Sequence, residues 1–376
     1  MISFKMSEEQ RGYIHSVRQL AQQEIAPLAL QMDEDSENFN WHYINILARE
    51  NLIAPIIPVE FGGRGLDYLT IAMIVEEIAA ACAGLAAAAV GTMHAVLPLL
   101  IGGTAEQKQE FLPGLTSQKP ALASFALTEP QGGSDIESNH TIATYMGDRI
   151  ILNGLKDYVI NGAVAQFVTV CAKSNTTGKR AFQFFIVPAN KIKVNMIRNT
   201  MGIRYVNTAQ LAMENVALEN RYALGQRDSG YLLLTQTLDI GRTLIAAIEV
   251  GIARAAFQLV LDYSRDREQF GRPIFSNQGI SFPLASMATS IEAARLMVWR
   301  ACDLIDKEED FTQASSMAKM YASEVAQNVT TGAIDIIGAA AYDTGHIANV
   351  YFRDAKVCGI VGGTNNIQKM IISSLL

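Results

Sequence analysis

The sequence predicts an α+β protein in which helices stand at both ends and a sheet lies between them. Residues 7–119 show helical periodicity, whereas residues 120 to about 222 change to short runs of β-branched and aromatic residues. From Ser229 onward, long Ala-rich periodic segments return, with apolar residues on more than one face. We therefore expect an N-terminal α-helical domain (1–119), a middle antiparallel β-domain (120–225) and a C-terminal four-helix bundle (226–376).

Local signals define the first helices. Ser7 and Thr104 each begin a capping box, because a Gln follows three residues later. The Ala- and Glu-rich stretch Thr70–Val90 predicts one further helix. The helix that Thr104 begins is expected to end near Pro113-Gly114.

Turn signals and charge divide the rest of the chain. Asn153-Gly154 and Asn161-Gly162 favour turns between the expected strands, which are Ile150–Leu152, Tyr158–Ile160, Phe167–Cys171 and Phe182–Val187. Three long helices are expected at about 229–265, 278–306 and 312–343, and the charged turn Asp306–Asp310 separates the last two.

The charge balance excludes several classes of function. Lys plus Arg number 30 against 37 Asp plus Glu, and this net charge of −7 argues against a nucleic-acid partner. Charged residues are only 18% of the chain, which indicates surface hidden in subunit contacts or in a membrane. The most apolar stretch, Ile78–Gly103, is Ala-rich, lacks basic flanks and contains Pro98. We therefore expect a buried helix there and no membrane partner.

The remaining composition predicts an ordinary cytoplasmic protein. Residues 1–10 lack the apolar core of a signal peptide. The cysteines are scattered without metal-ligand spacing, so we expect few disulfides and no metal site; they are Cys82, Cys171, Cys302 and Cys358.

Four segments, in order along the chain, carry a family resemblance. They are Ala126–Asp135 (ALTEPQGGSD), Lys156–Gly162 (KDYVING), Tyr263–Ile274 (YSRDREQFGRPI) with Gln278, and Arg353–Lys356 (RDAK) followed by Gly362–Gln368 (GGTNNIQ). Together they closely resemble the signature of the acyl-CoA dehydrogenase superfamily, and most of all its short-chain-type branch. The resemblance covers essentially the whole chain and implies that superfamily's three-domain fold.

The resemblance implies FAD as the cofactor. Taken alone, the Thr-Glu-Pro and Gly-Gly-Ser-Asp loop is either an ordinary Gly-rich loop or a cradle for a flavin edge or a phosphate. In the family, matching residues contact the flavin from three segments: Leu127, Thr128, Gly133 and Ser134; Tyr158 and Ile160; Thr364 and Asn366. Arg267, Phe270, Ile274 and Gln278 match residues that hold the adenine half of FAD bound to a neighbouring subunit, so a homodimer or homotetramer is implied.

Two departures from the family pattern concern catalysis. Most members place a Glu at the position of Gly362, and a second group places it at the position of Gly241, before Arg242. Glycine carries no proton acceptor, and a missing general base costs about 10²–10⁴ in rate. His94 is a weak candidate for a replacement base, because its helix borders the acyl pocket in the family. The favoured interpretation is a structural histidine that is hydrogen-bonded within the helix bundle. Substrate contacts are expected from Arg242, Ser134 and His94.

Two other positions also depart from the family. Ile160 stands where members usually have Ser or Thr donating toward flavin N5, and Asp335 stands where members have a Gln near the partner's FAD. The resemblance still implies that FAD binds, with altered contacts to the protein at these two positions.

The sequence thus favours an FAD-dependent oxidoreductase that acts on an acyl thioester carried by CoA or acyl carrier protein. The absent carboxylate indicates an atypical route, of a kind that secondary metabolism uses, in the class that oxidises carbon–carbon single bonds. The alternatives are a flavin-dependent monooxygenase or N-hydroxylase on the same fold, and a non-catalytic subunit of a heteromeric acyl-CoA dehydrogenase. These residues leave the electron acceptor open.

Overall fold

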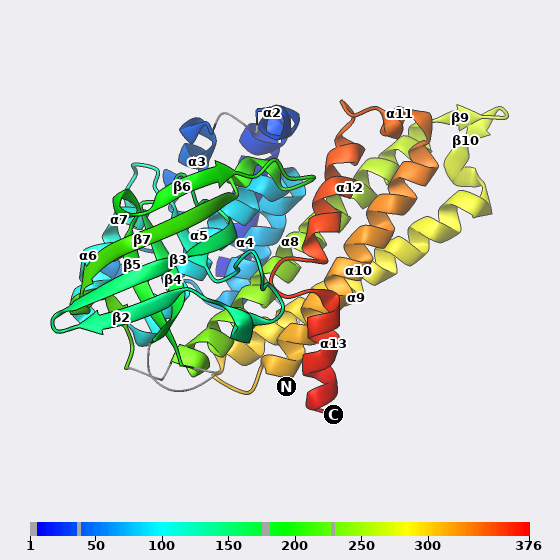
Figure 1. The fold of residues 1–376 in the computed structure, drawn as a ribbon. Coiled ribbons are helices and arrows are strands. Elements are labelled where there is room, and N and C mark those ends of the chain that lie inside the picture. The colour runs from blue at the N-terminus through cyan, green and yellow to red at the C-terminus, as the bar shows by residue number, and fades with distance from the viewer. Residues whose placement is uncertain (1–5, 36–38, 175–180, 227–229) are drawn as a thin grey trace.

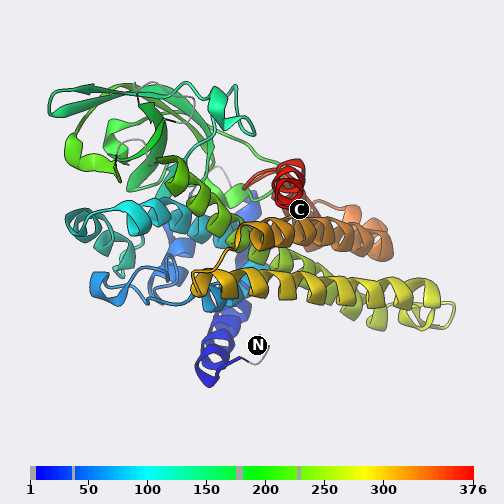
Figure 2. The same ribbon diagram turned by 90° about the horizontal axis from the view of Figure 1, so that it is seen from below.

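The expected order of helices, sheet and helices is the architecture of the protein. The computed structural model describes residues 6–35, 39–174, 181–226 and 230–376. A β-domain lies on one side, the N-terminal helices pack beneath it, and a bundle of long helices extends to the other side (Figures 1 and 2). The expectation of no signal peptide falls partly on residues 1–5, which lie outside the described residues.

The N-terminal part is helical from Glu8 to Thr116. Its main helices are α1 (Glu8–Leu20), α2 (Ala29–Glu34), α3 (Trp41–Ala48), α4 (Tyr68–Ala81), α5 (Ala83–Gly102), α6 (Ala105–Phe111) and α7 (Pro113–Thr116). Both capping boxes are confirmed, with Ser7 and Thr104 accepting from the backbone of the Gln three residues on. The prediction of one helix over Thr70–Val90 is wrong, because Cys82 is extended (φ −155°, ψ 106°) and divides α4 from α5.

The middle part is a sheet of eight strands. They are β1 (Ala123–Ala126), β2 (Ile142–Met146), β3 (Arg149–Val159), β4 (Phe167–Ser174), β5 (Phe182–Pro188), β6 (Lys193–Ile197), β7 (Ala209–Glu219) and β8 (Ala223–Leu224). The order is β6-β7-β3-β2-β4-β5-β8, and β1 pairs with β4. Most pairs are antiparallel as expected, but β4 pairs in parallel with β1 and β2, so the sheet is mixed.

One predicted turn lies inside a strand. Asn153-Gly154 falls within β3, where the register against β7 shifts between Leu152 and Gly154. Gly154 has φ +156°, and a Cβ there would lie 2.3 Å from the Thr141 hydroxyl. The dipeptide therefore marks a β-bulge, which uses glycine for the same conformational reason as a turn does.

The C-terminal part is built on three long helices. They are α8 (Gly230–Asp266), α9 (Gln278–Asp306) and α10 (Thr312–Ile337), with the short β9 (Glu268–Gln269) and β10 (Arg272–Pro273) between α8 and α9. Then follow α11 (Ala339–Tyr342), α12 (Ile347–Cys358) and α13 (Asn365–Ser374). The predicted segment 312–343 is interrupted, because Gly338 at φ +75° ends α10. Ser229 lies outside the described residues.

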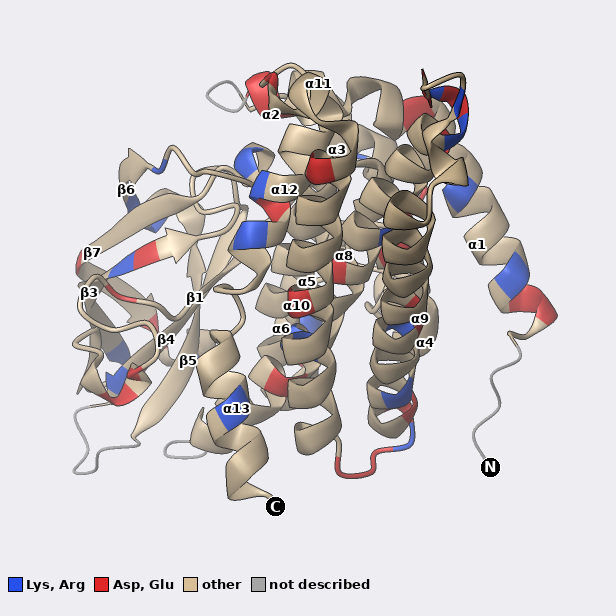
Figure 3. Cartoon of the chain, turned by 90° about the vertical axis from the view of Figure 1, so that its right-hand side faces the viewer, with Lys and Arg blue, Asp and Glu red and all other residues tan. Residues whose placement is uncertain are grey.

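Ion pairs with buried carboxylates join the N-terminal helices to each other and to the bundle. Glu77 on α4 pairs with Arg18 of α1 at 2.7 Å and with Arg254 of α8 at 2.8 Å. Its neighbour Glu76 pairs with Arg295 of α9 at 2.9 Å. Figure 3 shows that the bundle helices are otherwise mostly uncharged along their length. The low charge content is therefore partly explained by long, largely apolar helices.

Two described helices, α5 and α8, are long and apolar enough to cross a bilayer. The most apolar 18-residue window of α5 is 83% buried inside the protein, and that of α8 is 67% buried. Such burial is typical of core helices, and it matches the expectation that Ile78–Gly103 is buried. The four cysteines are all buried thiols.

Candidate active site

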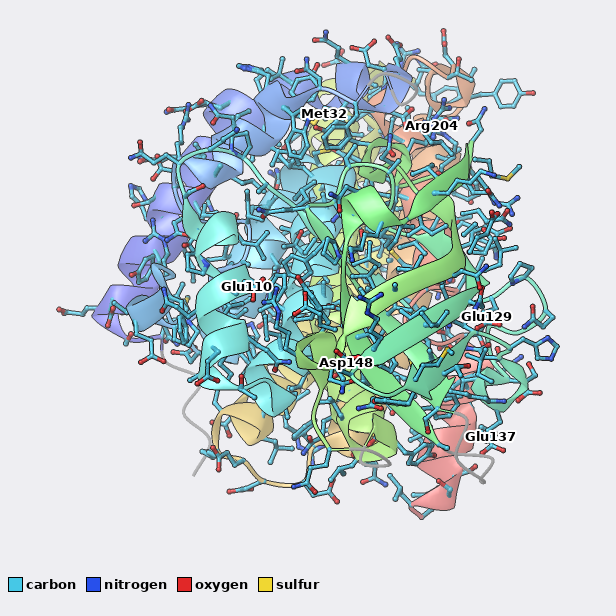
Figure 4. The ribbon with its side chains drawn as sticks, turned by 60° about the vertical axis from the view of Figure 1, so that its left-hand side comes forward. Met32, Glu110, Glu129, Glu137, Asp148 and Arg204 are labelled. Atoms are coloured by element: carbon cyan, nitrogen blue, oxygen red, sulfur yellow. The ribbon has the colours of Figure 1, made fainter. Side chains whose placement is uncertain are left out.

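A buried ion pair supports the loop that follows β1. The Lys156 ammonium lies 2.8 Å from Glu129 Oε1 and donates to the Leu127 carbonyl at 2.9 Å. Glu129 also accepts from the backbone N–H groups of His140 and Thr141, at 2.6 and 2.9 Å. Burial alone would raise the pKa of Glu129, but Lys156 and these donors lower the pKa to about 2. Figure 4 shows Glu129 beside the sheet, in the segment between β1 and β2.

The end of β3 lies against this loop. The Asp157 backbone N–H donates to the Thr128 carbonyl at 2.9 Å, which brings Tyr158 beside the loop. Tyr158 has φ +52° and is 60% exposed, and the Arg198 guanidinium lies 5.0 Å from its ring centre. Arg198 is held by Asp157 at 2.5 Å. The structure thus presents an exposed aromatic ring next to Leu127 and Thr128.

The glycines of the loop have different roles. A Cβ on Gly132 would lie 2.4 Å from the Ser138 hydroxyl, so only glycine fits there. At Gly133 the nearest atom to such a Cβ is Thr128 Cγ2 at 3.8 Å, so the surface beside it is open. Gly133 and Ser134 are both exposed. An open, glycine-lined loop with an exposed ring beside it fits a flat, polar-edged heterocycle such as the flavin of FAD.

The residues predicted for the adenine half of FAD lie elsewhere. Arg267 and Phe270 are exposed at the hairpin of β9 and β10, with Ile274 and Gln278 just after it. This hairpin stands at the far end of the bundle from the β-domain, beside α11 (Figure 1). Asp335, also exposed, lies near the end of α10. One chain therefore does not bring the two predicted halves of the FAD site together.

The last predicted cofactor residues begin α13. Thr364 caps this helix by accepting from the Ile367 backbone N–H at 3.3 Å, and Asn366 is exposed. Asn365 between them accepts from Ser323 at 2.8 Å and from the buried Lys319 at 3.4 Å. This anchoring on α10 fixes the loop that carries Gly362.

Gly241 lies on α8, and Gly362, in the loop between α12 and α13, lies against the same helix. A Cβ on Gly362, which has φ +68°, would lie 2.5 Å from Ile245 Cδ1 and 4.0 Å from Arg242 Cα. A Cβ on Gly241 would lie 1.5 Å from His94 Nε2. Because Gly241, Arg242 and Ile245 are neighbours on α8, both carboxylate positions lie at the same stretch of this helix. At each of them the space is taken by another side chain.

His94 and Arg242, two of the three predicted substrate residues, lie close together. Burial lowers the pKa of His94 to about 4, the Arg242 charge acts in the same direction, and a hydrogen bond to the Val90 backbone opposes them. Arg242 is itself buried and pairs with Asp239 at 2.9 Å and with Ser316 at 2.8 Å. Ser134, the third predicted substrate residue, lies on the exposed loop that follows β1.

Ile160 connects the flavin strand to the same region. Its Cγ2 would lie 2.6 Å from a Cβ on Gly91, so the side chain packs on α5 one turn before His94. The Ile160 carbonyl accepts from the Ser124 hydroxyl at 2.8 Å. The apolar Ile160 side chain therefore packs against α5, at the position where the resemblance leads us to expect a hydroxyl side chain.

Sequence reasoning assigned no role to several buried charges. Lys156 and Glu129 were part of recognised motifs, yet their pairing joins residues that are distant in sequence. Glu249 on α8 is fully buried with no hydrogen bond to either oxygen among the described residues. Burial raises the pKa of Glu249 well above its usual value, which the Lys319 ammonium opposes. The signal for Glu249 was a lone carboxylate within the apolar stretch 244–253 of α8.

Family models match nearly the whole chain. The N-terminal domain of acyl-CoA dehydrogenase matches residues 7–119, the middle domain matches 124–216, and the C-terminal domain matches 228–376.

Curated relatives agree with the family models. A cyclohex-1-ene-1-carbonyl-CoA dehydrogenase of Syntrophus aciditrophicus is 34% identical over 98% of this chain and 89% of its own length. A probable acyl-CoA dehydrogenase of Bacillus subtilis is 38% identical over the full length of both chains. The mitochondrial short-chain specific acyl-CoA dehydrogenase of Mus musculus is 34% identical over 100% of this chain and 91% of its own.

Solved structures share the fold. The butyryl-CoA dehydrogenase of Megasphaera elsdenii superposes with a TM-score of 0.95 at 31% identity, covering 100% of this chain and 99% of that one. The prolyl acyl carrier protein oxidase AnaB superposes with a TM-score of 0.93 at 29% identity, covering 99% of each chain. The chain therefore belongs to the acyl-CoA dehydrogenase family, and its cofactor is FAD.

Proposed function

We propose that this chain oxidises an acyl group held as a thioester on CoA or on an acyl carrier protein, by a route without the family's usual carboxylate. The observation that carries the proposal is the pair of glycines at the two carboxylate positions. The His94 ring fills the space that a side chain at Gly241 would occupy, and the Ile245 side chain does so at Gly362. Relatives named for acyl-CoA and acyl carrier protein substrates support the thioester.

The chain's own residues supply binding and orientation. FAD, when bound, supplies the two-electron acceptor. Leu127, Thr128 and Tyr158 would hold its ring, because they border the open loop that the Glu129–Lys156 pair supports. Arg242, buried and paired with Asp239, places a fixed positive charge beside His94 on the wall where the reacting carbons would lie.

We propose a homodimer or homotetramer. The distance between the loop after β1 and the hairpin of β9 and β10 supports this, since a second chain could bring its hairpin to the first chain's flavin (Figure 1). Light scattering on the holoprotein tests it, and a monomer that retains FAD would contradict it. We also propose a cytoplasmic enzyme of secondary metabolism; carrier proteins and synthases encoded beside it would support this.

The first experiment is a visible spectrum of the purified protein, followed by anaerobic titration. The thioesters are butyryl-CoA, cyclohexane-1-carbonyl-CoA and prolyl-loaded acyl carrier protein, chosen from the substrates that relatives' names print. Bleaching of the flavin by any of them supports the proposal. Failure of all three to bleach a yellow protein contradicts it.

The same titration separates the two alternatives. A yellow protein that bleaches only with a nicotinamide donor or a flavin reductase indicates the monooxygenase or N-hydroxylase. A colourless protein that takes up no added FAD indicates the non-catalytic subunit.

A further inference from the structure

Half of the described non-glycine residues with positive φ lie in two segments that touch each other. Tyr158 and Asn161, at φ +52° and +62°, stand at the end of β3. Ile203 and Asn207, at φ +50° and +49°, stand between β6 and β7. A β-branched residue such as Ile203 adopts these angles only under constraint. Strain of this kind persists where surrounding contacts fix the backbone, and it gathers at ligand sites.

The end of β3 is attached at one side through Asn161, which is fully buried. Its backbone N–H donates to the Val206 carbonyl at 2.8 Å. Its side-chain amide donates to the carbonyls of Ala88 on α5 and Ala123 on β1, at 2.8 and 3.2 Å. The residue is thereby fixed to α5, to β1 and to the β6–β7 connection, which comprises residues 198–208.

The other side is attached through Asp157. Arg198, at the start of the β6–β7 connection, pairs with the Asp157 carboxylate at 2.5 Å, and Gln210 of β7 donates to it at 2.9 Å. Tyr158 and Ile160, the residues expected to touch the flavin from this part of the chain, lie between the two attachments. The position of the β6–β7 connection therefore determines where both of them stand.

The β6–β7 connection is itself fastened to α12. The Arg353 guanidinium donates to the Met201 carbonyl at 2.7 Å. The buried Asp354 carboxylate accepts from the Ile203 backbone N–H at 2.5 Å. A Cβ on Gly202 would lie 2.2 Å from the Arg353 carbonyl oxygen, so the connection rests directly on the backbone of α12. Two consecutive residues of the helix thus hold three consecutive residues of the connection.

The same helix leads to the second predicted flavin segment. It ends at Cys358, and Thr364 and Asn366 follow at the start of α13. One flavin segment is therefore joined to α12 through the chain itself, and the other is held on it by the contacts of Arg353 and Asp354.

We propose that Asp354 and Arg353 are positioning residues, which keep the two flavin-contacting segments in register by fixing the β6–β7 connection on α12. This inference rests on the proposed placement of the flavin ring beside Tyr158, and it involves no acyl substrate. Burial raises the pKa of Asp354 to about 7, although the Ile203 N–H opposes the shift. What the site requires of Asp354 is therefore an oxygen that accepts this hydrogen bond rather than a fixed charge.

The test compares Asp354→Ala, which removes the acceptor, with Asp354→Asn, which keeps an acceptor oxygen without the charge. Asp306→Ala is the matched control. Asp306 of α9 also accepts from the backbone of a distant segment, at Tyr68 and Leu69, over 2.7 and 3.1 Å. None of the predicted flavin residues lies in that segment.

A second pair of variants approaches the same contacts from Arg353. Arg353→Met removes the donor to the Met201 carbonyl together with the ion pair to Asp33. Asp33→Asn removes that ion pair alone, so it is the control. Because the Arg353 side chain is 17% exposed, this pair decides the question if Asp354→Ala does not fold.

Two readings are taken on each protein. Hydrogen–deuterium exchange of the apo and FAD-loaded forms measures the protection of residues 157–162, and visible circular dichroism measures the surroundings of the bound flavin. Asp354→Ala and Arg353→Met should each speed this exchange and the dissociation of FAD by about tenfold, the effect of one lost buried hydrogen bond. The flavin dichroism should change with them. Asp354→Asn and Asp33→Asn should stay within about threefold of the parent. Asp306→Ala should lower the unfolding temperature and leave both readings as in the parent.

Either of two results would overturn the proposal. One is a folded Asp354→Ala or Arg353→Met protein in which both readings match the parent. The other is an Asp306→Ala protein that changes them equally, since a general loss of stability would then explain them. No thioester enters these measurements. A parent that oxidises no thioester therefore removes the proposed function, and the two readings still decide this inference.

Discussion

His94 Nε2 lies 1.5 Å from the point that a Cβ on Gly241 would occupy, so the two positions form one steric unit across α5 and α8. Gly241→Ala is expected to lower the free energy of unfolding by about 3 kcal/mol, the upper end for overpacking a core. His94→Ala should relieve most of that loss in the double variant, giving a coupling energy of about 2 kcal/mol. Urea unfolding of the two single variants and the double variant measures it.

Gly12 provides the control for this cycle. It lies within α1, and a Cβ there would meet nothing within 4 Å. Gly12→Ala is expected to raise stability by about 0.5–1 kcal/mol. Additive effects of Gly241→Ala and His94→Ala would contradict the contact.

Restoring a carboxylate at Gly362 is expected to fail as a single change. The residue has φ +68°, which costs about 1–3 kcal/mol for most side chains, and the Ile245 side chain must also move. Gly362→Glu should therefore unfold at a lower temperature than the parent and gain little dehydrogenase activity. The double variant Gly362→Glu/Ile245→Val should recover part of both, as calorimetry and flavin bleaching would show.

Asn serves as the matched control at Gly362, since it tolerates the left-handed region better than Glu. Gly362→Asn should lose less stability than Gly362→Glu. Equal losses would show that the backbone conformation is not the cause.

The Glu129–Lys156 pair is expected to control both stability and FAD content. Lys156→Met leaves Glu129 as a buried charge without its partner, which costs about 3–5 kcal/mol, and removes the donor to the Leu127 carbonyl. The variant should lose FAD during gel filtration. The exposed pair of Lys193 and Glu214, 3.8 Å apart in the same domain, is the control, and Lys193→Met should cost less than about 1 kcal/mol.

This pair also predicts sensitivity to acid. Because the pKa of Glu129 is lowered to about 2 in the folded state, its stabilisation is complete above pH 4.5 and is lost as the pH falls toward 2. Subtracting the unfolding free energy of Glu129→Gln from that of the parent should reveal this loss. A difference that does not change with pH would contradict it.

Glu249 predicts the opposite dependence. Its folded pKa is raised by burial, so the stability it contributes is present below about pH 4.5 and is lost as the pH rises through the folded pKa. Near pH 4, where the acid is mostly protonated in both states, Glu249→Gln exchanges a neutral acid for a neutral amide and should change stability by less than about 1 kcal/mol. As the pH rises from 4 to 9, the variant should become progressively more stable relative to the parent.

Thermal unfolding across this pH range measures the effect, with the exposed Glu309→Gln as control. A Glu249→Gln variant that is less stable than the parent by the same amount at every pH would show that the carboxylate is ionised in the folded protein.

Local signals in the sequence predicted local structure well. Ser7 and Thr104 carry their caps within four residues, and both boxes are confirmed. The break at Cys82 is missed because the Ala-rich run around it favours helix, and Gly84 two residues later is tolerated inside many helices. Asn153-Gly154 was read as a turn, since a bulge and a turn draw on the same conformational freedom of glycine.

The family motifs predicted which segments matter, but not how distant residues meet. No pattern joins His94 to Gly241 or Lys156 to Glu129, because these contacts depend on how α5 packs on α8 and how β3 meets the loop after β1. The lone buried Glu249 was visible in the sequence only as a charge within an apolar helix. Its lack of a hydrogen-bond partner among the described residues depends on the assembled bundle.

The filled space at both glycines has a consequence for how such a chain can vary. A substitution that introduced glutamate at position 241 would meet the His94 ring, and one at position 362 would meet Ile245 and an unfavourable backbone angle. Each carboxylate variant is therefore expected to need a second substitution, at His94 or at Ile245, before the fold accommodates it. Chains that keep His94 and Ile245 are therefore expected to keep both glycines as well.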